Sequence, residues 1–231
     1  AWDQPYGIPN YRVTGYRPPI MLPISSWRSV GASQNGFFHE SIMDEVAHAA
    51  GADPLDMRLS MMTDDTSRKV LEAVANMSGW DSKLPEGHGR GVAFVMSFGV
   101  PVAEVIEVVS TAKGIKILHA WAAVDVGIAL DPRNIEAQVQ SGINFGLAAA
   151  MMGEITIEDG AVAQSNFHDY DAIRMHQAPS IEVKILENGE KIRGIGEPGT
   201  PPAAPALANA IFSATGKRIR ELPLRKHIQF V

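Results

Sequence analysis

The stretch 194–202, which reads GIGEPGTPP, constrains the fold more than any other part of this chain. Its glycines permit backbone geometries that other residues avoid, and they let the main chain approach a ligand closely. Pro198 disfavours helical backbone at Glu197, so this carboxylate should project from an extended or turned loop. A run of small residues follows at 203–211, and proline is tolerated in the first turn of a helix. The sequence therefore predicts a stiff acidic loop that leads into a helix.

A carboxylate held in such a loop suits general-base chemistry, because partial burial raises the pKa of a carboxyl group towards the working pH. From spacing alone, the alternative is a Gly/Pro turn that carries one exposed glutamate. The loop lacks the third glycine of a dinucleotide-binding fingerprint and the GK[ST] ending of a phosphate-binding loop. A glycosidase carboxylate pair is a further alternative, and it needs a second acid across a cleft.

The composition narrows the classes of partner. The chain has 231 residues, of which 45% are hydrophobic and 20% are charged, as in a globular protein of one large or two small domains. Its 20 basic and 26 acidic residues give a net charge of −6, which disfavours nucleic acid as a partner. It has no cysteine, so its own thiolates cannot hold an iron–sulfur cluster. No apolar run reaches membrane-spanning length, and no membrane span is expected.

Hydrophobic periodicity divides the rest of the chain into helices and strands. Helical patterns cover 37–50, 54–61, 66–77, 132–152 and 203–215, and strand patterns cover 91–98, 102–110, 115–124, 154–157, 161–164 and 181–186. In the first helix, Phe38, Ile42 and Val46 should face the core. Glu40 and Asp44 lie on the opposite face, which should be solvated.

The predicted fold class is α+β, with mixed sheets and packed helices. We place an approximate boundary after residue 88. Residues 1–88 contain extended segments, a polar loop at 25–36 that carries Arg28, and helices. Residues 89–231 contain the strands, the long apolar helix, the GxGE loop and the C-terminal helix.

Six segments together carry a family likeness that covers nearly the whole chain. They are residues 27–31, 37–41, 124–132, 138–147, 166–170 and 194–202. In this order they resemble the C-terminal part of the molybdenum-binding large subunit of the xanthine dehydrogenase/aldehyde oxidase superfamily. Within that superfamily, the chain looks most like the isoquinoline 1-oxidoreductase beta-subunit type, and the GIGEPGTPP loop is the most specific match.

The resemblance implies a molybdenum hydroxylase that oxidises an aldehyde or an N-heterocycle with oxygen from water. In such enzymes a molybdopterin, here expected in its cytosine dinucleotide form, holds molybdenum with oxo, sulfido and hydroxide ligands. Glu197 would accept the proton of the hydroxide, and electrons would leave through the pterin to [2Fe–2S] centres on a partner chain. The alternative is a catalytically inactive binding or assembly module of the same fold that docks onto a partner subunit.

The resemblance also implies an obligate complex. The expected partners are the remaining part of the molybdenum subunit, a [2Fe–2S] subunit, and a cytochrome c or flavin subunit. Enzymes of this branch are often exported as folded complexes, so the periplasm is the expected compartment. The chain starts without methionine, at Ala1, and we expect it to be a fragment or one chain of a split protein.

Four positions fall within the family's active-site motifs, Arg28 and Gly31 on the cofactor side and Val30 and Phe98 on the substrate side. Arg28 lies where an arginine in an R-G-x-G loop presents its backbone amide beside the molybdenum. Here the loop reads RSVG, so Ser29 replaces the first glycine and Gly31 keeps the second. Val30 takes the place of an aromatic residue that packs on the substrate ring in purine-oxidising relatives, which argues against xanthine. Phe98 matches a second ring-contacting phenylalanine, with a buried strand residue as the alternative.

The remaining implied contacts belong to the cofactor. Gly194, Ile195 and Gly196 would touch the molybdopterin through main-chain groups. Gln138 and Gln140 are candidates to reach towards it, although two glutamines on a packed helix suit a structural role equally well. No side chain is expected to ligate the metal directly.

The seven histidines do not form a metal-binding pattern. Neither HxxxH nor HExxH occurs, so no protein-ligated zinc site is predicted. His168 and Asp169 are the best candidates for a local hydrogen-bonded pair, for which a structural role is favoured over a catalytic one.

Overall fold

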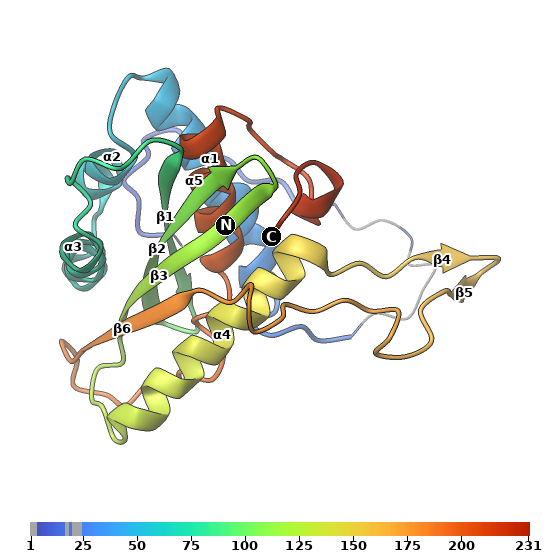
Figure 1. The fold of residues 1–231 in the computed structure, drawn as a ribbon. Helices are drawn as coiled ribbons and strands as arrows, with labels where there is room; N and C mark the ends of the chain where they lie inside the picture. Colours follow the sequence, from blue (N-terminus) through green and yellow to red (C-terminus); the bar gives the residue numbers. More distant parts are fainter. Residues whose placement is uncertain (1–3, 17–18, 20–24) are drawn as a thin grey trace.

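A mixed four-stranded sheet organises the computed structural model, which describes residues 4–16, 19 and 25–231 (Figure 1). Its strand order is β1 (His88–Ser97), β2 (Val100–Thr111), β3 (Gly114–Asp125) and β6 (Ser180–Leu186). The first three strands pair in antiparallel fashion, whereas β6 runs parallel to β3. A parallel pair needs a long crossover, and the connection over residues 126–179 contains α4 (Pro132–Met152). The extended segments predicted before residue 25 lie partly outside the described residues.

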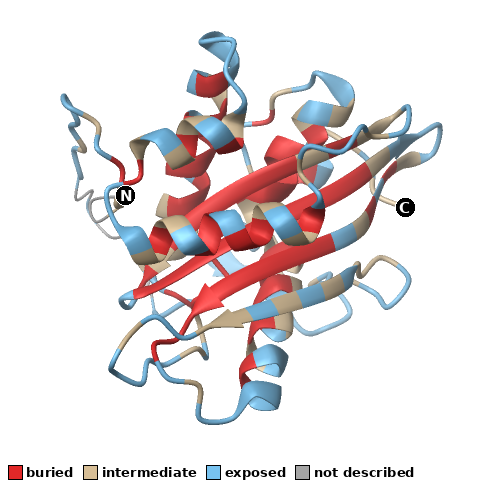
Figure 2. Cartoon of the chain, turned by 90° about the vertical axis from the view of Figure 1, so that its left-hand side faces the viewer, coloured by how far each residue is buried: buried red, intermediate tan, exposed pale blue. Residues whose placement is uncertain are grey.

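Helices cover both faces of the sheet, so β1, β2 and β3 are apolar and buried on both sides (Figure 2). On one face, α3 (Asp65–Ser78) packs against β2 and β3, and α2 (Pro54–Met61) packs against α3. On the other face, α5 (Ala203–Thr215) lies against β1 and β2, while α4 lies against β6. The mixed α/β architecture agrees with the predicted fold class.

The small residues at 203–211 are explained by how closely α5 approaches β1. A Cβ atom at Gly91 would lie 2.2 Å from the nitrogen of Ala210 and 2.3 Å from the carbonyl oxygen of Ala206. Real Cβ atoms are not found at such distances, so β1 needs glycine at this point and α5 needs small side chains. Gly216 ends α5 in the left-handed conformation, with φ 70°, as predicted.

Capping residues and turn residues in the sequence predict the positions of most other helices and strands to within a few residues. Asp53 caps α2 by accepting hydrogen bonds from the amides of Leu55 and Asp56, and Asp131 caps α4 in the same manner. The hairpin predicted around residues 159–160 is present as β4 (Ile157–Glu158) and β5 (Ala161–Val162). It lies at the tip of an arm that projects from the body of the protein (Figure 1).

The polar loop predicted at 25–36 is wrong in its second half, because α1 (Gly31–Ala49) begins there. Tertiary contacts explain the difference. A Cβ atom at Gly36 would lie 3.0 Å from the Val95 side chain and 3.2 Å from the carbonyl oxygen of Pro201, so this tight contact favours a glycine inside the helix. The Asn35 side chain donates to the carbonyl oxygen of Gly31 at 2.8 Å. Low helix propensity is thus outweighed by close packing.

The buried face of α1 is the reverse of the predicted one. Phe38, Ile42 and Val46 are exposed, whereas Glu40 and Asp44 are buried. Both carboxylates have a cationic partner from a distant segment. Arg58 of α2 donates to Glu40 at 2.8 Å, and Arg218 donates to Asp44 at 2.8 Å. Periodicity identifies two faces of a helix, but these remote partners decide which face lies inside.

Glu104 is a buried carboxyl group without a partner. It lies on β2 opposite Ala93 and Ala122, and neither of its oxygens has a hydrogen-bond partner among the described residues. Burial raises the pKa of Glu104 well above its ordinary value of 4.5. The folded protein therefore keeps this proton to a higher pH than the unfolded chain does.

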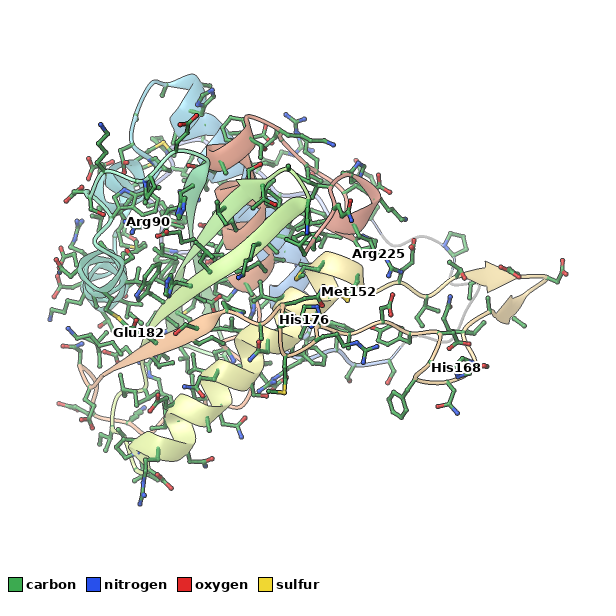
Figure 3. All side chains as sticks on the ribbon, in the orientation of Figure 1. Arg90, Met152, His168, His176, Glu182 and Arg225 are labelled. Carbon is green, nitrogen blue, oxygen red and sulfur yellow. The ribbon has the colours of Figure 1, made fainter. Side chains whose placement is uncertain are left out.

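We expect Glu104→Gln to stabilise the protein at neutral pH. Folding stability falls as the pH rises from the unfolded-state pKa towards the raised folded-state pKa, because only the unfolded chain ionises there. Glutamine cannot ionise, so the free energy of unfolding should rise by ~2 kcal/mol at pH 7 and change little at pH 4. Urea unfolding at both pH values measures this. Glu182→Gln is the control, because Glu182 is exposed on β6 (Figure 3). An equal gain in stability for Glu104→Gln at both pH values would contradict the explanation.

Candidate active site at the Glu197 loop

The loop that carries Glu197 lies between β6 and α5 and is anchored on α4. A Cβ atom at Gly142 of α4 would lie 2.9 Å from the carbonyl carbon of Gly199, so the two backbones touch. Residues 198–200 are buried, and the amide of Thr200 donates to the carbonyl oxygen of Glu197 at 2.9 Å. Glu197 itself is half-buried, at the outer end of this anchored turn.

The Glu197 carboxylate is held by the segment before α1. The backbone N–H of Ser29 donates to Oε1 of Glu197 at 2.9 Å. Ser29 and Val30 adopt φ values of 65° and 47°, in the left-handed region that favours glycine. Such conformations cost about 1–3 kcal/mol each and collect at functional sites. Local strain therefore accompanies the contact that orients this carboxylate.

Arg28 joins the loop to α4 through its side chain. Its guanidinium donates to the carbonyl oxygen of Gly196 from Nε at 2.8 Å and from Nη2 at 2.5 Å. It also donates to Ser141 Oγ at 3.0 Å and to Gln138 Oε1 at 3.3 Å. Burial lowers the pKa of Arg28, and the negative charge of Glu197 opposes that shift. The sequence resemblance predicts a main-chain role for Arg28, and the structure adds this side-chain role.

A cleft of about 360 Å³ opens beside the glycines of the loop. Its lining includes Gly194, Ile195, Gly196, Gln138 and Arg193. A Cβ atom at Gly194 would have no neighbouring atom within 4 Å. Within the described ranges, neither Gly194 nor Ile195 donates its amide N–H to another protein group. Peptide and amide groups are thus available to a ligand rich in heteroatoms. Gln140 does not line this cleft and donates to Glu136 at 3.0 Å.

The two predicted substrate-lining residues are exposed near Ser29. Val30 is 52% exposed and precedes Gly31, the first residue of α1. Phe98 is 64% exposed, in the turn between β1 and β2, with φ 52°. The alternative interpretation of Phe98 as a buried strand residue is therefore wrong. Its neighbour Ser97 shares a 2.8 Å hydrogen bond with Ser29, which brings this turn to the segment that holds Glu197.

Residues 29–179 match the model of the family described as "Molybdopterin cofactor-binding domain". The chain belongs to this family. It is 33% identical over 226 residues to the beta subunit of isoquinoline 1-oxidoreductase from Brevundimonas diminuta, a match that covers 95% of this chain and 29% of that protein. It is 29% identical over 240 residues to the B subunit of nicotinate dehydrogenase from Pseudomonas putida, covering 95% of this chain and 20% of that protein. The chain thus spans less than a third of either relative.

A solved structure agrees with the fold. Quinoline 2-oxidoreductase from Pseudomonas putida 86 superposes with a TM-score of 0.76 at 12% sequence identity, over 87% of this chain and 52% of that chain. The similarity at this level of identity concerns the fold alone. The assignment of the chain to the molybdopterin cofactor-binding domain family rests on the family match over residues 29–179.

Sequence reasoning missed two of the three serines that connect the parts of this molybdopterin-binding domain. Ser29 offers its amide to Glu197, Ser97 bonds the Ser29 hydroxyl, and Ser141 accepts from Arg28. Only Ser29 was signalled by the sequence, as a departure from the R-G-x-G pattern. Ser97 and Ser141 lie 68 and 113 residues from their partners, so no local motif includes them.

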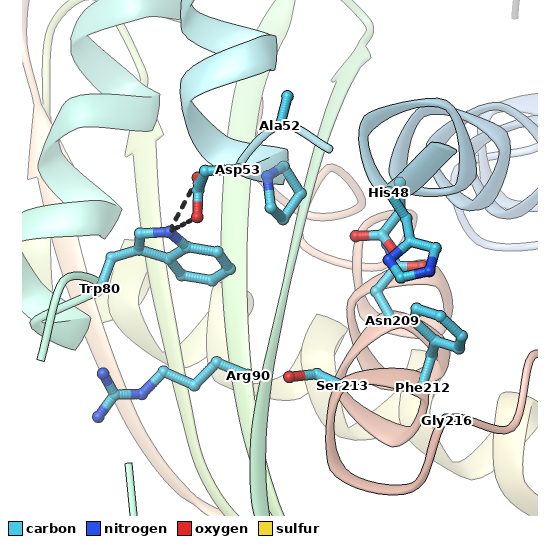
Figure 4. A pocket seen from close by; sticks show the side chains of 11 residues that line it. His48, Ala52, Asp53, Trp80, Arg90, Asn209, Phe212, Ser213 and Gly216 are labelled. Atoms are coloured by element: carbon cyan, nitrogen blue, oxygen red, sulfur yellow. Dashed lines mark hydrogen bonds between the residues drawn. The ribbon is translucent and has the colours of Figure 1, made fainter. Parts of the chain in front are cut away.

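A larger cavity lies elsewhere in the domain (Figure 4). It measures about 430 Å³, and its lining includes Asp53, Trp80 and Arg90 but none of the predicted site residues. Its charged groups already have partners, since Trp80 donates to Asp53 and Arg90 donates to Glu107. Arg90 lies seven residues from Ser97, about 23 Å along an extended strand, so this cavity is at the opposite end of β1 from the Ser29–Ser97 contact.

The histidines take no part in the Glu197 site. His168 lies on the projecting arm (Figure 3), is 76% exposed, and has its Nε2 atom 3.8 Å from Asp169 Oδ2. Asp169 instead accepts hydrogen bonds from the amides of Ser165 and Asn166, which shape a local turn. In the described part of the chain, no group of three or more His, Asp or Glu side chains could hold a metal. No helix there has the length and hydropathy needed to cross a membrane.

Proposed function

We propose that this chain forms part of the catalytic subunit of a molybdenum hydroxylase that oxidises an aldehyde or an N-heterocycle. The observation that carries the proposal is the Glu197 carboxylate, which is oriented by the Ser29 amide and follows Gly196. Gly196 lines a cleft that offers main-chain groups and the Gln138 amide beside isoleucine and leucine side chains. The names of the two relatives support an N-heterocycle, since isoquinoline and nicotinate both contain a ring nitrogen. Val30, which is small for a ring-packing position, supports a pocket that differs from a purine site.

The cleft residues fit a molybdopterin. The main-chain groups of residues 194–196 and the Gln138 amide would bind its polar edge, because they line the cleft and include amides without protein partners among the described residues. When bound, this cofactor, proposed in its cytosine dinucleotide form, supplies the redox chemistry. The [2Fe–2S] centres that receive the electrons belong to a partner in this proposal, since a chain without cysteine lacks the thiolates that such clusters need.

The chain's own residues position the reactants and accept a proton. Glu197 acts as the general base, with Oε1 fixed by the Ser29 amide. Arg28 fixes Gly196, the residue before the base, against α4. Val30 and Phe98 border the space in which the substrate ring would lie, because both are exposed beside Ser29. These roles require geometry that is set before the substrate arrives.

The partners in this proposal are the remaining part of the molybdenum subunit, a [2Fe–2S] subunit, and a cytochrome c or flavin subunit. The remaining part of the molybdenum subunit is supported by the two relatives, because this chain matches only 29% and 20% of their lengths.

Metal analysis and isotope labelling of the purified complex test the proposal. We expect stoichiometric molybdenum, and we expect the product formed in H₂¹⁸O to contain ¹⁸O because the inserted oxygen comes from water. A complex without molybdenum would instead support an inactive binding or assembly module. Product oxygen derived from O₂ would refute the hydroxylase assignment.

A further inference from the structure

The segment before α1 has a backbone conformation that its side chains disfavour. Ser29 and the β-branched Val30 both have positive φ, at 65° and 47°, where only glycine is unstrained. A conformation of this kind persists only when surrounding contacts determine it. The contacts of Ser29 therefore show what holds the segment in place.

A buried pair of hydroxyl groups holds Ser29. Its Oγ atom lies 2.8 Å from Oγ of Ser97, and the two residues are only 1% and 3% exposed. Ser97 is the last residue of β1 and pairs with Val100 of β2, so its position is set by the sheet. On the other side, Ser33 Oγ donates to the carbonyl oxygen of Arg28 at 2.7 Å. The strained segment is thus attached to a rigid strand at Ser29.

The strained conformation directs one amide. With φ at 65°, the N–H of Ser29 donates to Oε1 of Glu197 at 2.9 Å. Relaxation of this φ towards the ordinary negative region would rotate the neighbouring peptide planes and move the amide away from the carboxylate. The hydroxyl of Ser97 and the carboxylate of Glu197 are therefore linked through one residue.

We propose that Ser97 is a positioning residue for the reaction, because its hydroxyl holds Ser29 in the conformation that orients Glu197. Ser97 itself is not placed against the reacting atoms, and it acts through Ser29. This inference rests on the proposed function, in which Glu197 is the general base.

A double-mutant cycle in the complete complex tests the inference. We expect Ser97→Ala to lower kcat ~10-fold with little change in KM, because the base is misplaced while substrate binding is retained. Ser29→Gly gives the second background, with its own kcat as the reference, because glycine adopts φ 65° without strain, keeps its N–H and lacks the hydroxyl that bonds Ser97. In the Ser29→Gly background, Ser97→Ala should then have little further effect. Equal losses from Ser97→Ala in both backgrounds would overturn the proposal.

Hydrogen–deuterium exchange of the peptide covering residues 27–33 gives a readout independent of activity. We expect Ser97→Ala to speed its exchange, because the Ser29 amide loses its fixed acceptor, and Ser97→Thr to restore slow exchange and kcat together. Ser60→Ala is the control, since this exposed hydroxyl on α2 contacts only the carbonyl oxygen of Met57 among the described residues. If Ser97→Ala folds poorly, kcat and exchange are compared between Ser29→Gly and the Ser29→Gly/Ser97→Ala double variant, and between the wild type and Ser97→Thr.

The two proposals fail in different ways. A fully active Glu197→Gln enzyme would overturn the role of Glu197 as base. Unchanged exchange in Ser97→Ala, or a failure of Ser97→Thr to restore both readouts, would overturn the positioning role of Ser97.

Discussion

Glu197→Gln is expected to lower kcat by ~10³-fold while the complex keeps its molybdenum. Glutamine has nearly the same shape as glutamate, and its side-chain oxygen can still accept the hydrogen bond from the Ser29 amide, which is 2.9 Å from Oε1 in the native site. The loop should therefore keep its conformation, because its anchors on α4 are main-chain contacts of residues 198–200. What is lost is the ability to accept a proton.

Steady-state turnover and metal analysis of the same preparation measure this effect. Glu190→Gln is the matched control, since it removes an exposed carboxylate seven positions earlier in the same connection and should leave turnover unchanged. A Glu197→Gln complex that turns over at the native rate with full molybdenum content would refute the base assignment. Loss of molybdenum would instead indicate a role in holding the cofactor.

Arg58→Met is expected to reduce the free energy of unfolding by about 3–5 kcal/mol. Arg58 is completely buried, and it donates to Glu40 Oε2 at 2.8 Å, to the Glu40 carbonyl oxygen at 2.9 Å and to the Pro54 carbonyl oxygen at 2.8 Å. Its removal leaves the equally buried Glu40 carboxylate without its cation. The amide of Phe94 and the ring of His39 also bond this carboxylate, but they do not replace the lost charge.

Chemical denaturation measures the loss, and α1 offers a matched comparison. Arg220 donates two hydrogen bonds to Glu45, at 2.9 and 2.7 Å, but this pair lies at the surface. Arg220→Met should therefore change stability little, because water screens an exposed ion pair and solvates the carboxylate that remains. Equal losses of unfolding free energy in Arg58→Met and Arg220→Met would show that burial does not increase the contribution of the Glu40–Arg58 pair to stability.

Short-range signals explain which parts of the fold were predictable. Asp53 and Asp131 begin their helices by bonding amides two or three residues ahead, and Gly216 ends α5 by adopting a conformation open to glycine. The apolar runs of β1, β2 and β3 were located by local hydrophobic pattern in the same way, although these strands are buried on both faces. The GIGEPGTPP loop also contains local constraints, but its pattern alone left a Gly/Pro turn with an exposed glutamate as an alternative. The family resemblance was needed to choose Glu197 and the adjacent glycines as candidate site residues.

The tertiary structure decided what depends on residues far apart in the chain. Glu40 faces inward because Arg58 and the amide of Phe94 meet it there, and no pattern within α1 contains those partners. Arg28 reaches Gly196 across 168 positions, and the Ser29–Ser97 pair spans 68. The sequence alone determined the elements and the acidic loop, because backbone conformation is set by near neighbours. Burial and orientation of charged groups depend on desolvation, and only the folded chain brings together the partners that offset it.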